Sequence, residues 1–146
     1  KSCLIKKKFV EKDEKEKGLR KVLNLGHTFA HAYESSFNYS RNLNHGEAVL
    51  LGIMTAIKFS FDIKLIKKKD FYLIKKHLQK SEIKICLKNF FSNRDVEKII
   101  NFMKTDKKNT SKKINLVLLK KISKPVYNIN FDHIKLKAFL RRELNN

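Results

Sequence analysis

Hydrophobic and polar residues follow a helical period along most of this chain. Apolar residues recur at spacings of three and four, which predicts helices over residues 2–12, 19–37, 45–65, 68–80, 93–104 and 133–144. The segment 45–65 is apolar on nearly every side, so we expect it to be the buried central helix. Asn44 with Glu47 three residues later has the pattern of a capping box at the start of that helix.

Two later segments have the composition of short strands. Residues 114–119 and 126–130 predict a β-hairpin with Pro125 on its turn side, and Asp132 then caps the last helix. The chain has only 4 Gly and 1 Pro, which disfavours a turn-rich β fold. The expected fold class is therefore mainly α, with one small β-hairpin, and residues 1–146 are expected to form one helical domain.

The net charge of +20 raises the question of nucleic acid. The basic residues are mostly lysines scattered over every segment, whereas readers of phosphates and base edges favour arginine. We therefore do not expect nucleic-acid binding as the main role, and a basic binding module remains an alternative of another class. An affinity for anionic substrates is the milder consequence of the charge.

The chain lacks the features of a membrane or secreted protein. Its longest apolar run, residues 48–61, is interrupted by Lys58, so no membrane partner is expected. Cys3 and Cys86 lie far apart, which favours reduced thiols in a cytoplasmic protein. The sequence opens with Lys1 in the middle of a helical pattern, and we interpret it as a piece of a longer polypeptide.

A polar stripe runs along the predicted helix 19–37. On a helix its members point to one side, while the rest of the segment is mostly apolar; they are Arg20, Asn24, His27, His31 and Glu34. Buried polar groups cost free energy unless they are paired. The solvent-facing sides of the other predicted helices consist mainly of lysine, whereas this stripe does not. The stripe therefore predicts a functional site.

Three of the five histidines fall in this region, which suggests a metal site. In one arrangement, His27 and His31 both bind one metal. In the other, one of them binds it together with His45, and the remaining histidine transfers protons. The spacing alone does not separate these arrangements. Glu34 and Glu47 are alternatives for a third ligand, although each also has an ordinary structural role.

The residues of this region closely resemble the C-terminal domain of 3-dehydroquinate synthase, a sugar phosphate cyclase family. The resemblance is carried by Leu23–Glu34, by His45–Val49 and by the run from Lys6 to Arg20. Asp106-Lys107-Lys108, followed by a Leu-Val-Leu-Leu strand, matches a later motif of the family. The resemblance covers essentially the whole chain in order.

The resemblance implies a helical C-terminal domain that normally packs against an N-terminal α/β nucleotide-binding domain. The family converts the seven-carbon sugar acid phosphate DAHP into 3-dehydroquinate and phosphate in the shikimate pathway. NAD transiently oxidises a ring hydroxyl, phosphate is eliminated, the ketone is reduced again, and the ring opens and recloses. NAD is bound mainly by the N-terminal domain, so the isolated chain is expected to be inactive. The intact enzyme is expected to be a homodimer.

The resemblance also implies roles for individual residues. His27 and His45 correspond to ligands of zinc, or of another divalent metal such as cobalt, and the third ligand is a glutamate upstream of this sequence. His31 corresponds to a histidine near the leaving phosphate and is the expected proton relay. Four further positions correspond to substrate contacts, with Lys107 preferred over its neighbour Lys108 for the phosphate: Lys6, Arg20, Asn24 and Lys107.

The sequence departs from the family pattern at a few glycines. Ala30 stands between the two histidines where the family usually has glycine, Ser123 replaces another, and residues 109–112 lack a third. None of these changes removes a reactive group. Alternatives within the enzyme class are another sugar phosphate cyclase or a metal-dependent polyol dehydrogenase; outside it, a non-catalytic remnant. Arg20, Asn24 and Lys107 favour an acid phosphate over a plain polyol.

Overall fold

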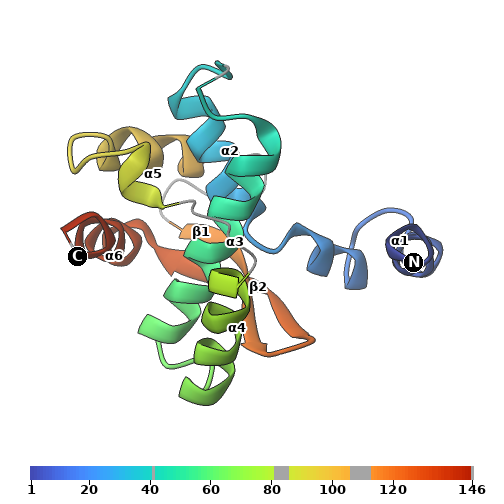
Figure 1. The fold of residues 1–146 in the computed structure, drawn as a ribbon. Helices are drawn as coiled ribbons and strands as arrows, with labels where there is room; N and C mark the ends of the chain where they lie inside the picture. Colours follow the sequence, from blue (N-terminus) through green and yellow to red (C-terminus); the bar gives the residue numbers. More distant parts are fainter. Residues whose placement is uncertain (41, 81–85, 106–112, 146) are drawn as a thin grey trace.

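The computed structural model describes residues 1–40, 42–80, 86–105 and 113–145 (Figure 1). The elements follow in chain order: α1 (Ser2–Lys12), 3₁₀ helix η1 (Leu19–Asn24), α2 (His27–Ser36), α3 (His45–Asp62), α4 (Lys68–Lys80), 3₁₀ helix η2 (Leu87–Asn89), α5 (Val96–Thr105), β1 (Lys113–Lys121), β2 (Lys124–Asp132) and α6 (His133–Asn145). This order confirms the predicted mainly α class with one β-hairpin.

Helix α3 is the centre of the fold, as its sequence predicts. The capping box at its start is confirmed: Asn44 Oδ1 accepts from Glu47 N at 3.2 Å, and Glu47 Oε2 accepts from Asn44 N at 3.0 Å. In Figure 1, α2 and α5 lie beside its first half, and α4 and the hairpin lie beside its second half. The core between these elements is apolar and aromatic, and its largest buried members include Phe29, Tyr33, Phe59, Ile99, Met103, Leu116 and Phe139.

The prediction of one continuous helix over residues 19–37 is wrong. The chain forms the 3₁₀ helix η1, turns at Leu25 and Gly26, and starts α2 at His27. Gly26 has a φ of 79°, which a residue with a Cβ adopts only with strain. A Cβ placed on Gly26 would also lie 2.4 Å from the backbone N of Ile53 in α3. Gly26 therefore permits both the turn and the close approach of α2 to α3.

The hairpin is longer than predicted and packs with one face on the core. β1 and β2 pair antiparallel around a two-residue turn at Ile122 and Ser123, and Pro125 lies within β2 opposite Leu119. Ser123 has a φ of 60°, which is the left-handed conformation that glycine usually adopts. Ser60 in α3 accepts the Leu119 N–H at 3.1 Å, which ties β1 to the central helix.

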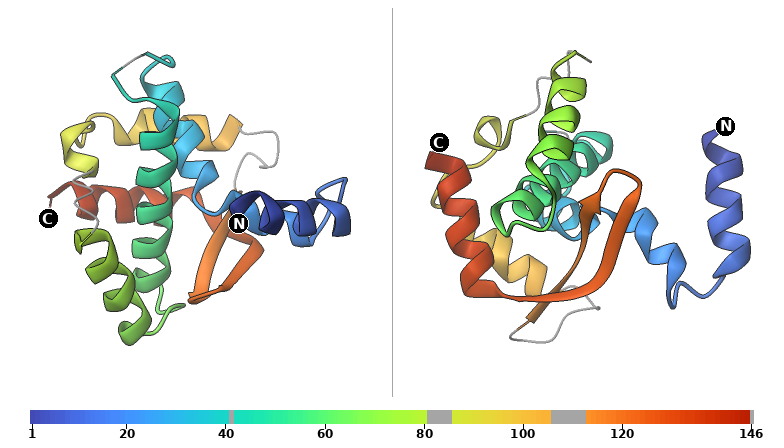
Figure 2. Two further views of the ribbon diagram at one scale, coloured as in Figure 1. Left: turned by 45° about the vertical axis from the view of Figure 1, so that its right-hand side comes forward. Right: turned by 90° about the horizontal axis from the view of Figure 1, so that it is seen from below.

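Helix α1 projects from the rest of the molecule. It has no buried residue, and Leu4 and Ile5 are 64% and 54% exposed. Figure 2 shows α1 standing apart, reached through η1. At the other end of the chain, Asp132 Oδ1 accepts from Ile134 N at 2.7 Å and so caps α6 as predicted. Within the described residues, no helix is both long and apolar enough to cross a bilayer.

Candidate functional site

The approach to the site is a tight loop organised by Asp13. Its carboxylate accepts three backbone N–H groups: Lys17 at 2.9 Å, Gly18 at 2.8 Å and Arg20 at 2.9 Å. These bonds favour the charged form, and those from Arg20 and Gly18 contribute most to holding the pKa of Asp13 below its usual value. The Arg20 guanidinium in turn donates to the Glu14 carbonyl at 2.7 Å. The loop thus fixes the start of η1 and the backbone position of Arg20.

A hollow of about 560 Å³ lies between α1 and η1. Asn24 donates from Nδ2 to Glu16 Oε1 at 2.6 Å within it. Its polar lining comes from both elements and from the start of α2, and includes Lys6, Glu16, Arg20, Asn24 and His27. Four of these are predicted site residues. Glu16 was part of the matched sequence run but was not predicted as a site residue.

A second hollow of about 650 Å³ adjoins the first and shares Glu16, Asn24 and His27 with it. It extends along α2 to His31 and reaches the hairpin. The hairpin side chains that line it are Asn115, Val117, Tyr127 and Asn128. The sequence prediction missed these residues, because which hairpin side chains face α2 depends on strand register, and no local signal marks it.

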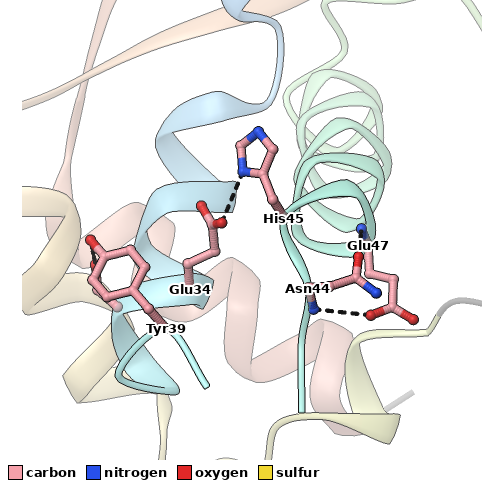
Figure 3. Close-up of polar contacts among 6 residues, drawn as sticks. Glu34, Tyr39, Asn44, His45 and Glu47 are labelled. Carbon is pink, nitrogen blue, oxygen red and sulfur yellow. Dashed lines mark hydrogen bonds and ion pairs between the residues drawn. The ribbon is translucent and has the colours of Figure 1, made fainter. Parts of the chain in front are cut away.

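A third hollow of about 540 Å³ continues from His31 to the start of α3. His45, the first residue of α3, faces Glu34 of α2, and its Nδ1 lies 2.9 Å from Glu34 Oε1 (Figure 3). Glu34 is 8% exposed, so it is not the open end of a solvent-facing stripe. Glu47 points the other way, into the capping box, and this side chain is already used structurally.

The histidines of α2 form an edge-on pair. The ring centroids of His27 and His31 lie 5.8 Å apart with the planes at 87°. Burial lowers the pKa of the half-buried His27 below its usual value; the Leu25 carbonyl opposes this shift, and the nearby His31 and His45 rings add to it. At a given pH below neutral, the neutral ring with its free lone pair is therefore more populated in His27 than in an ordinary histidine.

The structure thus brings together the predicted site residues that it describes. Lys6, Arg20, Asn24, His27, His31 and His45 all line these three adjoining hollows. Lys107, like the rest of residues 106–112, lies outside the described residues. Within the described ranges, no group of three His, Cys, Asp or Glu side chains is arranged to hold a metal ion. A metal bound by two of the histidines would need a further ligand.

The comparisons with known proteins agree in family. A family model described as 3-dehydroquinate synthase C-terminal matches residues 1–109. The chain is 54% identical over 143 residues to the 3-dehydroquinate synthase of Pelagibacter ubique (strain HTCC1062). This match covers 98% of this chain and 39% of that relative. It is 39% identical over 138 residues to the 3-dehydroquinate synthase of Endomicrobium trichonymphae, covering 94% of this chain and 37% of that relative. The chain therefore spans less than two-fifths of the length of these relatives.

Solved structures include one with a similar fold. It is a crystal structure of 2-deoxy-scyllo-inosose synthase complexed with carbaglucose-6-phosphate, NAD⁺ and Co²⁺, with a TM-score of 0.64 and 24% sequence identity. The match covers 88% of this chain and 36% of that chain. At this identity the likeness concerns the fold alone. The match of the family model over most of the chain, together with the two close relatives, shows that the chain belongs to the 3-dehydroquinate synthase family, in its C-terminal part.

Proposed function

We propose that this chain is the metal- and substrate-binding part of a 3-dehydroquinate synthase, which converts DAHP to 3-dehydroquinate and phosphate. One observation carries the proposal most: the site residues implied by the family motifs line adjoining hollows along η1 and α2, wherever the structure describes them. We propose further that residues 1–146 act as one domain of a cytoplasmic homodimer.

His27 and His45 would hold a divalent metal, zinc or cobalt. The donor chemistry fits, because imidazole nitrogen suits both metals and burial favours the neutral form of His27 by lowering its pKa. The Nδ1 of His45 is engaged by Glu34, which leaves Nε2 for a ligand bond. A catalytic zinc has three protein ligands, so the third would come from outside the described residues. When bound, such a metal orients a substrate diol and lowers the cost of deprotonating its hydroxyl.

The remaining residues would bind the substrate and move protons. Lys6 and Arg20 bring positive charge to the first hollow, which suits a substrate with a carboxylate and a phosphate. Asn24 would donate a hydrogen bond to a ring hydroxyl of the substrate, or accept one from it. His31, exposed between the second and third hollows, would pass a proton near the leaving phosphate. Lys107 is proposed as a phosphate contact on the sequence match alone.

NAD would be bound mainly by a nucleotide-binding domain that is not part of this sequence. The relatives are more than twice as long as the matched region, which leaves room for such a domain. Helix α1 has no buried residue and exposes Leu4 and Ile5, and Ile5 lines the first hollow. The chain tested alone is therefore expected to have no turnover.

The test is a DAHP-dependent phosphate-release assay on the native polypeptide, with NAD and Zn²⁺ or Co²⁺ supplied and the carbocyclic product identified. Formation of 3-dehydroquinate, and its loss in Arg20→Ala, supports the proposal. As a control, Lys17→Ala removes a nearby exposed cation whose side chain lines none of the three hollows. Turnover of a different sugar phosphate, or none with any, would assign the chain to another cyclase or to a non-catalytic remnant.

A further inference from the structure

Glu34 is a carboxylic acid that is buried beside the apolar core, where packing alone would favour an apolar side chain. It lies in the last turn of α2, its side chain is 11% exposed, and the residues on either side of it include the buried Tyr33. Carboxylates are almost never this buried unless they are paired, because removing a charge from water is costly. The partner is His45, whose Nδ1 lies 2.9 Å from Glu34 Oε1 (Figure 3).

The two partners differ in exposure: the Glu34 carboxylate is buried, whereas the His45 ring is open to water. This difference indicates what the contact does. The His45 side chain is 69% exposed, so the contact is at the rim of the third hollow. A polar contact this open to water adds little to stability, even when both partners are charged. The two helices already pack closely at Gly26 and Gly52. If the Glu34–His45 contact served only to hold α2 against α3, apolar side chains in its place would stabilise the fold more. The buried carboxylate is better explained by what it does to the exposed ring.

Both partners are held by the ends of their helices. The Glu34 carbonyl accepts the N–H groups of Phe37 at 3.1 Å and Tyr39 at 2.9 Å, which fixes the end of α2. His45 is the first residue of α3, directly after the capping residue Asn44. The Glu34–His45 contact thus joins two fixed backbone positions, and the ring of His45 is the movable part that it restrains.

An ionised carboxylate has only acceptors, so the hydrogen in this contact sits on Nδ1 of His45. The other ring nitrogen, Nε2, then carries the free lone pair, and in Figure 3 it points away from Glu34. Histidines that bind metals commonly donate their second N–H to a carboxylate, which sets both tautomer and orientation. We propose that Glu34 is a positioning residue that holds His45 as the Nδ1–H tautomer, with Nε2 presented to a divalent cation. This inference rests on the proposed metal site.

The first experiment needs no metal. In the ¹⁵N-labelled, metal-free native polypeptide at pH 8, NMR of the imidazole nitrogens reports the tautomer of His45. We expect the Nδ1–H form to dominate, and its share to fall in Glu34→Ala and to be restored largely in Glu34→Gln, whose amide oxygen still accepts. The proposal is overturned if Glu34→Ala leaves the tautomer ratio unchanged.

The second experiment measures Co²⁺ affinity by competition with a chelator, together with the cobalt absorption spectrum. Glu34→Ala is expected to weaken binding about 10–100-fold, with a partial recovery in Glu34→Gln. The matched control is Glu47→Ala, which removes another carboxylate in the first turn of α3 and loosens the cap without touching the ring. If this control weakens Co²⁺ binding as much as Glu34→Ala does, a loosened helix start explains the effect and the proposal is wrong.

His45→Ala separates this inference from the proposed function. Loss of Co²⁺ binding in His45→Ala with normal binding in Glu34→Ala would refute the role of Glu34 and keep the metal site. Normal Co²⁺ binding in His45→Ala would instead show that His45 is not a metal ligand, and would refute both the ligand pair proposed above and the role of Glu34.

Discussion

Gly26 and Gly52 face each other where the start of α2 crosses the middle of α3. A Cβ added to Gly52 would lie 2.4 Å from the Gly26 carbonyl oxygen and 2.9 Å from the Ala30 N. Both are backbone atoms, so the helices would have to separate. We expect Gly52→Ala to lower the free energy of unfolding by about 1–3 kcal/mol, as measured by urea denaturation.

The matched control is Gly46→Ala in the first turn of the same helix. The nearest atom to a Cβ there is Asn44 Oδ1 at 3.7 Å, which is ordinary contact. Since alanine favours a helix over glycine by about 0.5–1 kcal/mol, this variant should be as stable as the parent or slightly more so. Equal losses in the two variants would mean that the crossing does not limit the packing of α2 on α3.

A second prediction concerns the buried hydroxyl chain of Tyr33 and Thr55. Tyr33 Oη donates to Thr55 Oγ1 at 3.0 Å, and Thr55 Oγ1 donates to the Leu51 carbonyl at 2.8 Å. Tyr33→Phe should cost about 1 kcal/mol, whereas Thr55→Val leaves the buried Tyr33 hydroxyl without its acceptor and should cost about 1–3 kcal/mol. The double variant should lose less than the sum of the two, as measured by urea denaturation. Simple additivity would show that the two hydroxyls do not act together.

A third prediction follows from the carboxylate of Asp13. Its pKa is lowered in the folded chain, so its contribution to loop stability is present above the usual value of 3.8 and is lost as the pH falls through the lower folded value. In NMR spectra the amide protons of Lys17, Gly18 and Arg20 should therefore titrate together, with a midpoint below 3.8. Asp13→Asn should abolish this common titration, and Glu14→Gln, in the same loop, should leave it. Independent midpoints would contradict the shared carboxylate.

The sequence was sufficient for the helices whose caps and period agree. Helix α4 has the predicted bounds, and the start of α3 follows from the side chains of Asn44 and Glu47, which act within one turn. The break at Gly26 was missed because helical periodicity continues across it. What interrupts the helix is the backbone of α3 at Gly52 and Ile53, which lies directly against Gly26 in space. These residues are 26 and 27 positions further along the chain, so no local sequence pattern marks the contact.

The candidate site was predicted for a partly incorrect reason. Arg20 and Asn24 do not continue the helix that carries His27, yet all three line the first hollow, because η1 leads into α2 along the same side. The buried partner of His45 was not predicted, since the pairing of Glu34 with a residue of the next helix depends on how α2 and α3 cross. The hairpin contribution, such as Tyr127, depends in the same way on register.

The last prediction separates the three histidines by role. In the native polypeptide, His27→Ala and His45→Ala should each abolish stoichiometric Zn²⁺ binding and DAHP turnover together, since each would remove one ligand of the proposed site. His31→Ala should retain Zn²⁺, because the proposed ligands are His27 and His45, and should slow turnover about 10²–10⁴-fold, the usual contribution of a positioned proton donor.

The measurements are metal content after dialysis and the rate of phosphate release at saturating DAHP. His77→Ala, on the exposed face of α4, serves as the control for loss of a histidine as such and should change neither. Loss of Zn²⁺ in His31→Ala with full retention in His45→Ala would reverse the assignment: the i, i+4 pair on α2 would hold the metal, and His45 would become the candidate for proton transfer.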